Sequence, residues 1–344
     1  MSKNLNLGLI GAGRIGRVHA GHLAHRIPKA RLLMVADVDR AAAQACAAAC
    51  GDGVVVAEAY QAMLENPEVE AVVICSATDT HAAIIEAAAG AGKHIFCEKP
   101  IDFDLGRIDR ALAAVARAGV TLQVGFNRRF DANFRRVREA VARGEIGQPH
   151  RVHIVSRDPA PPPIDYVKVS GGLFLDMPIH DFDMARFLIG SEVEAVYTAA
   201  GVRVDPAIGA AGDLDTAVVV LHFENGVIGT IDNSRQAVYG YDQRVEVFGS
   251  GGSIRIDNNH PNTAVVSTAE HVHRDLPLNF FMDRYVESFV AEMEAFVEAV
   301  LTGTPPPVSG HDGRMPVVMG LAARRSYDEK RPVRLAEVEA TLRR

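Results

Sequence analysis

Tryptophan is absent from this sequence of 344 residues, and cysteine and excess charge are scarce. The formal net charge is only −7, from 43 acidic and 36 basic residues spread along the chain. This balance argues against a nucleic-acid backbone or an anionic membrane surface as partner. No apolar run reaches the roughly 18 residues that a membrane-spanning helix needs. The first apolar segment, LGLIGAG, runs directly into a glycine motif without a cleavage site, so we expect a cytoplasmic protein.

The four cysteines give no sign of a disulfide framework or a metal site. None of them forms a CxxC pair; they are Cys46, Cys50, Cys75 and Cys97. Cys46 and Cys50 could share one helix face, but two soft ligands without nearby partners favour packing over metal binding. We therefore expect reduced, mostly buried thiols and no metal.

Length and composition are typical of a folded protein with two domains. Hydrophobic residues make up 48% of the chain and charged residues 23%, close to the average of globular proteins. A chain of this length exceeds what one ordinary core contains. We therefore look for a change of pattern along the sequence that separates two domains.

The first part of the chain alternates short apolar runs with helical segments, which predicts a parallel sheet covered by helices. Unbroken apolar runs are typical of parallel strands that are buried on both faces. The expected helices lie near 14–26, 40–50, 58–65, 80–91 and up to about 118. The expected strands are Leu5–Ile10, Leu32–Asp37, Val54–Val56, Ala71–Cys75, His94–Cys97 and Thr121–Gly125.

After Gly125 the pattern changes to longer segments in which apolar and polar residues alternate, which predicts an antiparallel sheet. Asn225 and Gly226 lie between two such segments and favour a hairpin turn, because both residues tolerate positive φ. Helices near 131–143, 178–189 and 284–302 are expected to cover one face, with a last helix near 313–328. The expected strands are His150–Ser156, Glu194–Gly201, Thr216–Phe223, Val227–Asp232, Arg244–Gly249 and Ser253–Asp257.

The glycine motif GAGRIG lies between the first strand and the first helix, which is where a dinucleotide-binding fold carries it. Gly11 permits the tight turn, Gly13 lets the backbone approach a pyrophosphate, and Gly16 allows close packing of helix and strand. Arg14 and Ile15 complete the motif. Asp37, at the end of the second strand, can accept hydrogen bonds from the adenosine ribose and would repel a 2′-phosphate, so we expect NAD, although Arg40 leaves NADP open.

Polar residues also follow the expected strands Ala71–Cys75 and His94–Cys97, at the edge where parallel sheets bind ligands. Ser76, Thr78 and His81 could line the cofactor, although capping of a helix by a threonine explains much of the same segment. Glu98-Lys99-Pro100 follows the second of these strands, His94–Cys97. The Lys99 ammonium could hold a substrate oxygen and stabilise a developing alkoxide, or it could be an ordinary surface lysine.

The segment Asp176–Asp183 (DMPIHDFD) contains the densest group of candidate catalytic residues. Pro178 suits the first turn of a helix, which places Asp176 and His180 about one turn apart. Oxidation of an alcohol requires removal of the hydroxyl proton, and a neutral imidazole is a suitable acceptor at pH 7. A metal site formed by His180 with Asp181 and Asp183 is disfavoured, because adjacent residues point to different helix faces.

Taken together, these motifs resemble those of the Gfo/Idh/MocA oxidoreductases over essentially the whole chain. The broad signals are GAGRIG at 11–16, the stretch Thr78–His81 and Glu98-Lys99-Pro100. The narrower ones are FNRRFD at 126–131, HDFDMARFL at 180–188, VDPAIG at 204–209 and DNSRQAVYGYDQRVEVFGS at 232–250. The resemblance implies a Rossmann NAD-binding domain over 1–124 and an α/β substrate-binding and oligomerisation domain with a large, mostly antiparallel open sheet over 125–344.

The resemblance also implies a reaction and a set of site residues. Lys99, Asp176 and His180 are expected to be catalytic, with a cis-capable bond before Pro100. The implied activity is NAD-dependent oxidation of a cyclitol, myo-inositol, to the 2-keto product; scyllo-inositol or an aldose such as glucose, an NAD-dependent glycosidase and a non-catalytic NAD-binding protein are the alternatives. Expected substrate contacts are Lys99, Arg129, Asp158, Asp176, His180 and Tyr239, and expected cofactor contacts include Ser76, Thr78, His81, Glu98 and Lys99.

Finally, the resemblance implies that the open face of the second sheet packs against another subunit, giving a homotetramer built as a dimer of dimers. The valines Val218, Val220, Val245 and Val247 are expected on one exposed side of that sheet. Left uncovered, they would form a large apolar patch.

Overall fold

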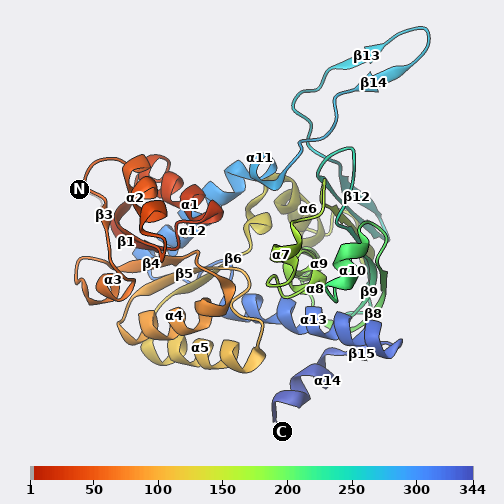
Figure 1. Ribbon diagram of the computed structural model, residues 1–344. Coiled ribbons are helices and arrows are strands. Elements are labelled where there is room, and N and C mark those ends of the chain that lie inside the picture. Colours follow the sequence, from red (N-terminus) through yellow and green to blue (C-terminus); the bar gives the residue numbers. More distant parts are fainter. Residues whose placement is uncertain (1–3, 344) are drawn as a thin grey trace. The chain divides into compact units, whose positions relative to one another are not determined.

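The structure is a computed structural model that describes residues 4–343 and divides into two compact units (Figure 1). The first unit contains the chain up to Phe130 together with Glu287–Met315. The second contains Asp131–Val286 and the chain from Pro316 onward. The chain therefore returns to the first unit after the boundary that the sequence suggested at 124/125. The assignment of cofactor and substrate functions to 1–124 and 125–344 stays a prediction.

The first unit contains a six-stranded parallel sheet in the order β3-β2-β1-β4-β5-β6, as the alternating pattern predicted. Its strands are β1 (Leu5–Ile10), β2 (Ala30–Ala36), β3 (Val55–Val56), β4 (Ala71–Ile74), β5 (His94–Glu98) and β6 (Leu122–Gly125). The connecting helices are α1 (Arg14–His25), α2 (Arg40–Ala49), α3 (Gln61–Glu65), α4 (Thr78–Gly90) and α5 (Leu105–Ala118). Because the strands are parallel, the loops that follow β1, β4 and β5 all emerge at the same edge of the sheet.

Helix α12 (Val286–Thr302) belongs to the core of the first unit. Its residues Met293, Phe296 and Val297 are buried in the same cluster as Leu7 and Leu9 of β1. The expectation that a helix near 284–302 covers the second sheet was therefore wrong. Helical periodicity identifies an apolar face, but it does not say which of two sheets that face will contact.

The second unit contains a seven-stranded sheet in the order β12-β11-β7-β10-β9-β8-β15. Only the central pair β7 and β10 is parallel, so the expectation of a mostly antiparallel sheet is confirmed. The turn at Asn225 and Gly226 joins β9 and β10, as predicted, with Gly226 at φ 85°. The strands are β7 (Pro149–Arg157), β8 (Val193–Gly201), β9 (Thr216–Phe223), β10 (Ile228–Ser234), β11 (Asp242–Gly249), β12 (Gly252–Ile256) and β15 (Val333–Arg334).

Helices of the second unit contact this sheet and one another. Helix α9 (Pro178–Ile189) lies against β7 and β10, and α6 (Ala132–Ala142) packs on α9. The other helices of this unit are α7 (Ile164–Val167), α8 (Leu173–Asp176), α10 (Pro206–Ala210), α11 (Phe281–Arg284) and α14 (Leu335–Glu339). Helix α13 (Gly310–Glu329) begins in the first unit and continues in the second from Pro316. A hairpin of β13 (Val265–Ser267) and β14 (Val272–Arg274), which the sequence did not predict, exposes all six of its strand residues.

The strand register shows that Val245 and Val247, which were expected on the exposed face of the second sheet, lie on its buried face. Val218 is 45% exposed, whereas Val245 and Val247 are 3% and 0% exposed. Val218 is paired with Asp232 of β10, which is paired with Val155 of β7. Val155 is in turn paired with Arg244 of β11, so Val218 and Arg244 lie on the same face of the sheet. Since successive residues of a strand face opposite sides, Val245 and Val247 point to the buried face. No helix within residues 4–343 is long and apolar enough to cross a membrane.

Candidate active site

The glycine loop after β1 has the shape that a pyrophosphate requires. Gly11 has φ +97°, and a Cβ at Gly16 would lie 1.9 Å from the Gly11 carbonyl oxygen, so neither position accepts a side chain without distortion. A Cβ at Gly13 would meet nothing within 4 Å, which leaves open space beside the loop. Helix α1 begins at Arg14, and no side chain caps its first turn, so its N-terminal amides remain available to an anion.

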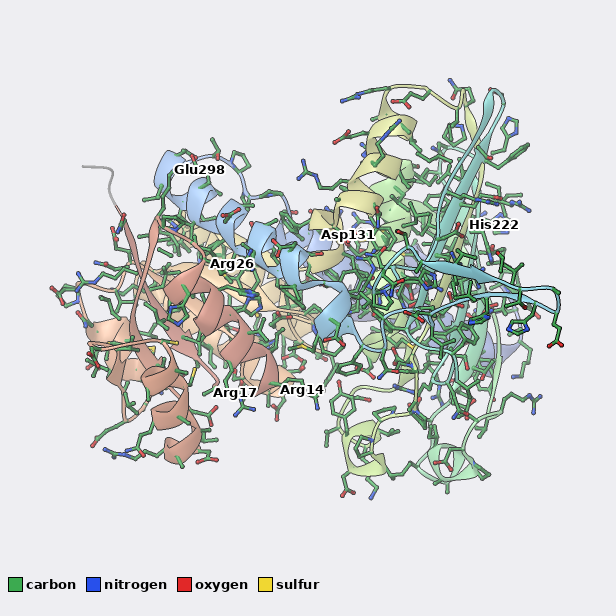
Figure 2. The ribbon with its side chains drawn as sticks, turned by 90° about the horizontal axis from the view of Figure 1, so that it is seen from above. Arg14, Arg17, Arg26, Asp131, His222 and Glu298 are labelled. Atoms are coloured by element: carbon green, nitrogen blue, oxygen red, sulfur yellow. The ribbon has the colours of Figure 1, made fainter. Side chains whose placement is uncertain are left out.

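The remaining residues of this motif occupy two environments. Arg14 is exposed at the start of α1, as Figure 2 shows, and Ile15 is partly buried against the core of the unit. Asp37 follows β2, and its carboxylate accepts hydrogen bonds from the backbone amides of Ala12 and Asp39. The bond from Ala12 ties Asp37 to the glycine loop, where its carboxylate can accept hydrogen bonds from ribose hydroxyls. The loop and Asp37 thus fit a dinucleotide.

His81 joins two of the loops at the carboxyl edge of the sheet. It is 1% exposed, with Nδ1 2.8 Å from the Pro100 carbonyl oxygen and Nε2 2.9 Å from that of Ser76. Because both acceptors are carbonyl oxygens, both bonds form only when both ring nitrogens carry a proton. His81 therefore positions the loops after β4 and β5 relative to each other. The contact of its side chain with a cofactor stays a prediction.

The other predicted residues of these loops lie beside His81. The Ser76 hydroxyl is 2.7 Å from that of Thr80, and α4 begins at Thr78 without a side-chain cap. The capping alternative for Thr78 is therefore not seen in the structure. Lys99 is half-buried directly after β5, and its bond to Pro100 is cis, as the resemblance implied.

Arg129, an expected substrate contact, lies in the first unit in a short 3-10 helix, Asn127–Phe130. Its Nη2 is 2.9 Å from Oδ1 of Asp312, and their side chains are 10% and 20% exposed. Burial alone would raise the pKa of Asp312, but Arg129 and hydrogen bonds from Ser309 outweigh it and lower this pKa to about 2. Arg129 is thus held in place by a carboxylate of its own unit.

Asp176 and His180 lie at the junction of α8 and α9 in the second unit. Asp176 ends α8, and His180 is in the first turn of α9, which Pro178 opens as predicted. Met177 between the two helices keeps helical dihedral angles, φ −102° and ψ −63°. The chain therefore continues as a helix, which places these residues at i and i+4 on adjacent turns.

Two side chains that the sequence reasoning missed hold Asp176. The Tyr166 hydroxyl donates to Oδ1 at 2.7 Å, and Nη1 of Arg235 donates to Oδ2 at 2.9 Å. Arg235 is 1% exposed, and its Nη2 also lies 3.6 Å from Oδ2 of Asp213. Burial raises the pKa of Tyr166, and the charge of Asp176 adds to the effect, so this hydroxyl keeps its proton.

Arg235 could have been suspected from the sequence, because it lies inside the long stretch 232–250 that carries the resemblance. Tyr166 gave no signal. Asp181, a member of the disfavoured metal site, is fully buried and accepts a hydrogen bond from Asn233 at 2.8 Å. Its role is in the packing of α9 on the sheet.

The two remaining expected substrate contacts lie on neighbouring segments of the second unit. Asp158 follows β7, and its backbone is bonded to Ser234 and Ala237. The Tyr239 hydroxyl donates to Asp242 at 2.6 Å and accepts from Arg157 at 3.1 Å. Burial, followed by the bond to Asp242, raises the pKa of Tyr239. Tyr239 is therefore a fixed neutral hydroxyl.

Comparison with known families agrees with both units. Residues 5–126 match the model of an oxidoreductase family with an NAD-binding Rossmann fold, and residues 134–255 match that of the GFO/IDH/MocA C-terminal domain. The chain belongs to the GFO/IDH/MocA oxidoreductase family. Its first unit is accordingly an NAD-binding Rossmann domain, and the fold and cofactor expected from the sequence are confirmed.

Several members of this family are similar to the chain over nearly its whole length. A Thermotoga maritima protein named myo-inositol 2-dehydrogenase is 49% identical, over 97% of this chain and 99% of that protein. An inositol 2-dehydrogenase of Rhizobium meliloti is 47% identical, over 96% and 99%. The solved structure of scyllo-inositol dehydrogenase from Lactobacillus casei with bound NAD(H) and scyllo-inositol has a TM-score of 0.90 and 30% identity, and covers 97% of this chain and 100% of that one.

Proposed function

We propose that this protein is an NAD-dependent inositol 2-dehydrogenase that oxidises myo-inositol to the 2-keto product. The observation that carries the proposal is the near-complete match to the Thermotoga maritima protein of that name. The chain also has, at the positions expected of the family, a lysine after β5, an aspartate at the end of α8 and a histidine in the first turn of α9.

The proposed roles follow from the chemistry of the side chains. His180, as a neutral imidazole, takes the proton of the substrate hydroxyl. Lys99 donates a hydrogen bond to the same oxygen and stabilises the negative charge that develops on it. Asp176 orients the substrate and His180 and favours the cationic form of the ring. Bound NAD supplies the hydride acceptor.

The contacts of Asp176 support its role as an orienting group. Arg235 compensates its charge, and Tyr166 holds its other oxygen, so the carboxylate has one preferred orientation. A carboxylate oxygen can accept more than one hydrogen bond. A substrate hydroxyl or the His180 ring can be a further donor.

The proposed substrate contacts Arg129, Asp158 and Tyr239 suit a ring that carries only hydroxyl groups. Tyr239 already donates its proton to Asp242, so toward a substrate it can only accept. Arg129, by contrast, can only donate. Such a mixture of donors and acceptors distinguishes hydroxyl orientations, and thus isomers, rather than charge.

A substrate panel tests the proposal. Myo-inositol, scyllo-inositol and glucose are each tested with NAD and with NADP, and formation of the reduced cofactor is followed by absorbance. We expect the fastest rate with myo-inositol and NAD. The scyllo-inositol dehydrogenase of Lactobacillus casei makes scyllo-inositol the second candidate. Faster turnover of scyllo-inositol or glucose would reject the proposed substrate. Glycoside cleavage without net formation of NADH, or NAD binding without any turnover, would reject the proposed dehydrogenase activity.

The proposed residue roles have a separate test. His180→Ala and Lys99→Met should each lower kcat about 10²–10⁴-fold, the usual contribution of a positioned proton acceptor or charged donor. Binding of NADH, followed by its fluorescence, should stay close to that of the wild type. Glu294→Gln, a change at an exposed position of α12, is the control. Full turnover by either active-site variant contradicts the roles.

We further propose a homotetramer in which the open face of the second sheet contacts another copy. Tyr197, Val218, Ile228 and Phe248 lie on this face and are each at least 40% exposed. Their burial would remove a large apolar patch from water. Tyr197→Arg combined with Phe248→Asp should reduce the mass measured by light scattering, and an unchanged mass contradicts this interface. The cytoplasmic location stays a prediction.

A further inference from the structure

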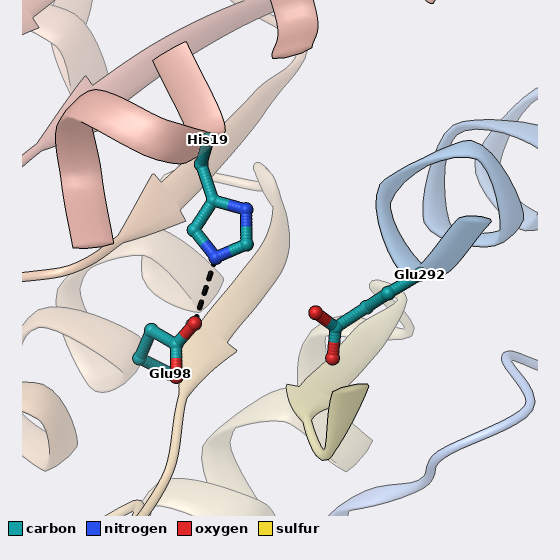
Figure 3. Close-up of side chains that lie close together, drawn as sticks. All are labelled: His19, Glu98 and Glu292. Atoms are coloured by element: carbon teal, nitrogen blue, oxygen red, sulfur yellow. Dashed lines mark hydrogen bonds and ion pairs between the residues drawn. The ribbon is translucent and has the colours of Figure 1, made fainter. Parts of the chain in front are cut away.

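A buried group of side chains that can ligate a metal lies in the first unit; it includes Glu98, an expected cofactor contact, but none of the residues with a proposed catalytic role. His19 comes from α1, Glu98 ends β5, and Glu292 comes from α12, so three separate segments meet here (Figure 3). His19 Nε2 is 2.7 Å from Oε1 of Glu98. One donor atom from each of the three residues lies within 4.8 Å of the other two.

Glu292 is the residue of this group whose side chain makes no hydrogen bond in the structure. It is 0% exposed, and neither of its carboxylate oxygens has a hydrogen-bond partner. Figure 3 shows its carboxylate directed toward the pair formed by His19 and Glu98. A buried polar group without a partner costs about 1–3 kcal/mol, and more when it is charged. Such a group in a native fold calls for a specific reason.

We propose that His19, Glu98 and Glu292 form a binding site for one divalent cation of the zinc type. A neutral imidazole and two carboxylates carry a total charge of −2, which a divalent cation cancels. An imidazole nitrogen with two carboxylate oxygens is a donor set that suits Zn²⁺ better than Mg²⁺ or Ca²⁺, which prefer oxygen ligands only. The cation would also give the Glu292 carboxylate the partner that it lacks.

The geometry requires only small movements. Donor atoms at about 2.1 Å from a tetrahedral zinc lie about 3.4 Å apart. The present separations differ from this by an amount on the order of 1 Å, which side-chain rotation can supply. Glu98 is 12% exposed, whereas His19 is 0% exposed, so an ion can enter along the Glu98 carboxylate.

The electrostatics of Glu292 agree with this geometry. Burial, and after it the charge of Glu98, raises the pKa of Glu292 well above its ordinary value. A cation between the two carboxylates removes both effects, because it stabilises their ionised forms. The sequence could not reveal this site, since residues 19, 98 and 292 show no ligand spacing.

Calorimetric titration of the full-length protein with Zn²⁺, after treatment with a chelator, tests the site. We expect one tight site per chain. Outer-shell partners of a metal are already worth about 10–100-fold in affinity, so Glu292→Gln, which removes a direct ligand, should weaken Kd at least about 100-fold. Glu294→Gln, an exposed change on the same helix, should bind as the wild type does.

Two controls keep the experiment decisive. His271 and His273, which stack with ring centroids 4.9 Å apart, can hold zinc weakly at the surface, but that binding is independent of Glu292. If Glu292→Gln does not fold, as judged by circular dichroism, Glu292→Met replaces it. Absence of a tight site in the wild type, or equal affinity in the variants at 292 and 294, overturns the proposal.

A spectroscopic measurement gives a second readout. Co²⁺ bound in a compact site of four or five ligands absorbs visible light more strongly than hydrated Co²⁺. We expect this absorption in the wild type and in Glu294→Gln, with saturation at one equivalent, and its loss in Glu292→Gln. A cobalt spectrum that is the same in all three proteins contradicts ligation by Glu292.

Discussion

Removal of the Arg235 guanidinium should disturb both stability and activity, because Arg235 is the buried partner of Asp176. Arg235→Met keeps most of the apolar stem and leaves the Asp176 carboxylate without its cation. Breaking a buried ion pair from one side costs about 3–5 kcal/mol. Asp176 is 13% exposed, so water partly compensates, and we expect the lower end, about 3 kcal/mol.

The assay is thermal unfolding combined with steady-state kinetics. For a unit of this size each kcal/mol corresponds to about 2–4 °C, so Tm should fall by roughly 6–12 °C. The kcat should fall as well, because Asp176 loses its orientation, while binding of NADH to the other unit is retained. Arg334→Met is the control: Arg334 is 71% exposed and pairs with Glu194, so its loss should cost less than about 1 kcal/mol.

A double-mutant cycle with Asp176→Asn identifies the cause. Once the carboxylate is neutral, loss of Arg235 no longer strands a charge, so the double variant should be more stable than the sum of the single effects by about 1–3 kcal/mol. Additive effects would show that the unpaired charge of Asp176 is not the cause of the instability. Equal Tm values of Arg235→Met and Arg334→Met would likewise contradict a large contribution of the buried pair.

Three further changes test other parts of the structure. Gly13→Ala should leave Tm unchanged but weaken NADH binding at least about tenfold, or about 1.4 kcal/mol. Gly16→Ala should lower both Tm and the affinity for NADH, because its Cβ would meet the backbone of Gly11. Equal Tm values of the two variants would contradict this. His81→Leu should lower the free energy of unfolding, measured in urea, by about 1–3 kcal/mol, because a buried carbonyl oxygen of Pro100 or Ser76 loses its donor, whereas the exposed His25→Leu should cost far less. The pKa of Asp312 is lowered from 3.8 to about 2, so its ionised carboxylate, with Arg129 and Ser309 as partners, stabilises the fold by about 2 kcal/mol above pH 4, and this contribution is lost as pH falls from about 4 through about 2. Unfolding free energies of wild type and Asp312→Asn that keep a constant difference between pH 5 and 2 would disprove that contribution.

Local patterns in the sequence were sufficient for much of the fold. The strand before Gly11, the helix that starts at Arg14 and the turn at Asn225 and Gly226 each depend on residues close together in the chain. Backbone preference and hydrophobic period determine such elements. The parallel first sheet and the mostly antiparallel second sheet follow from them.

What the sequence could not supply depends on contacts between distant segments. The apolar face of α12 was predicted, but its contact with the first sheet was not. Val245 and Val247 were placed on the wrong face, because a one-residue difference of register between strands reverses the side. Arg235 reaches Asp176 across 59 residues, and Glu292 approaches Glu98 across a greater separation. No local spacing encodes either contact.

The proposed function depends on transfer of a hydride from a ring carbon of myo-inositol to NAD. The most direct measurement uses myo-inositol deuterated at carbon 2, with the reduced cofactor then analysed by mass spectrometry. We expect NADH that carries one deuterium, formed in step with the 2-keto product. Reduced cofactor without deuterium, or no reduced cofactor at all, would contradict it.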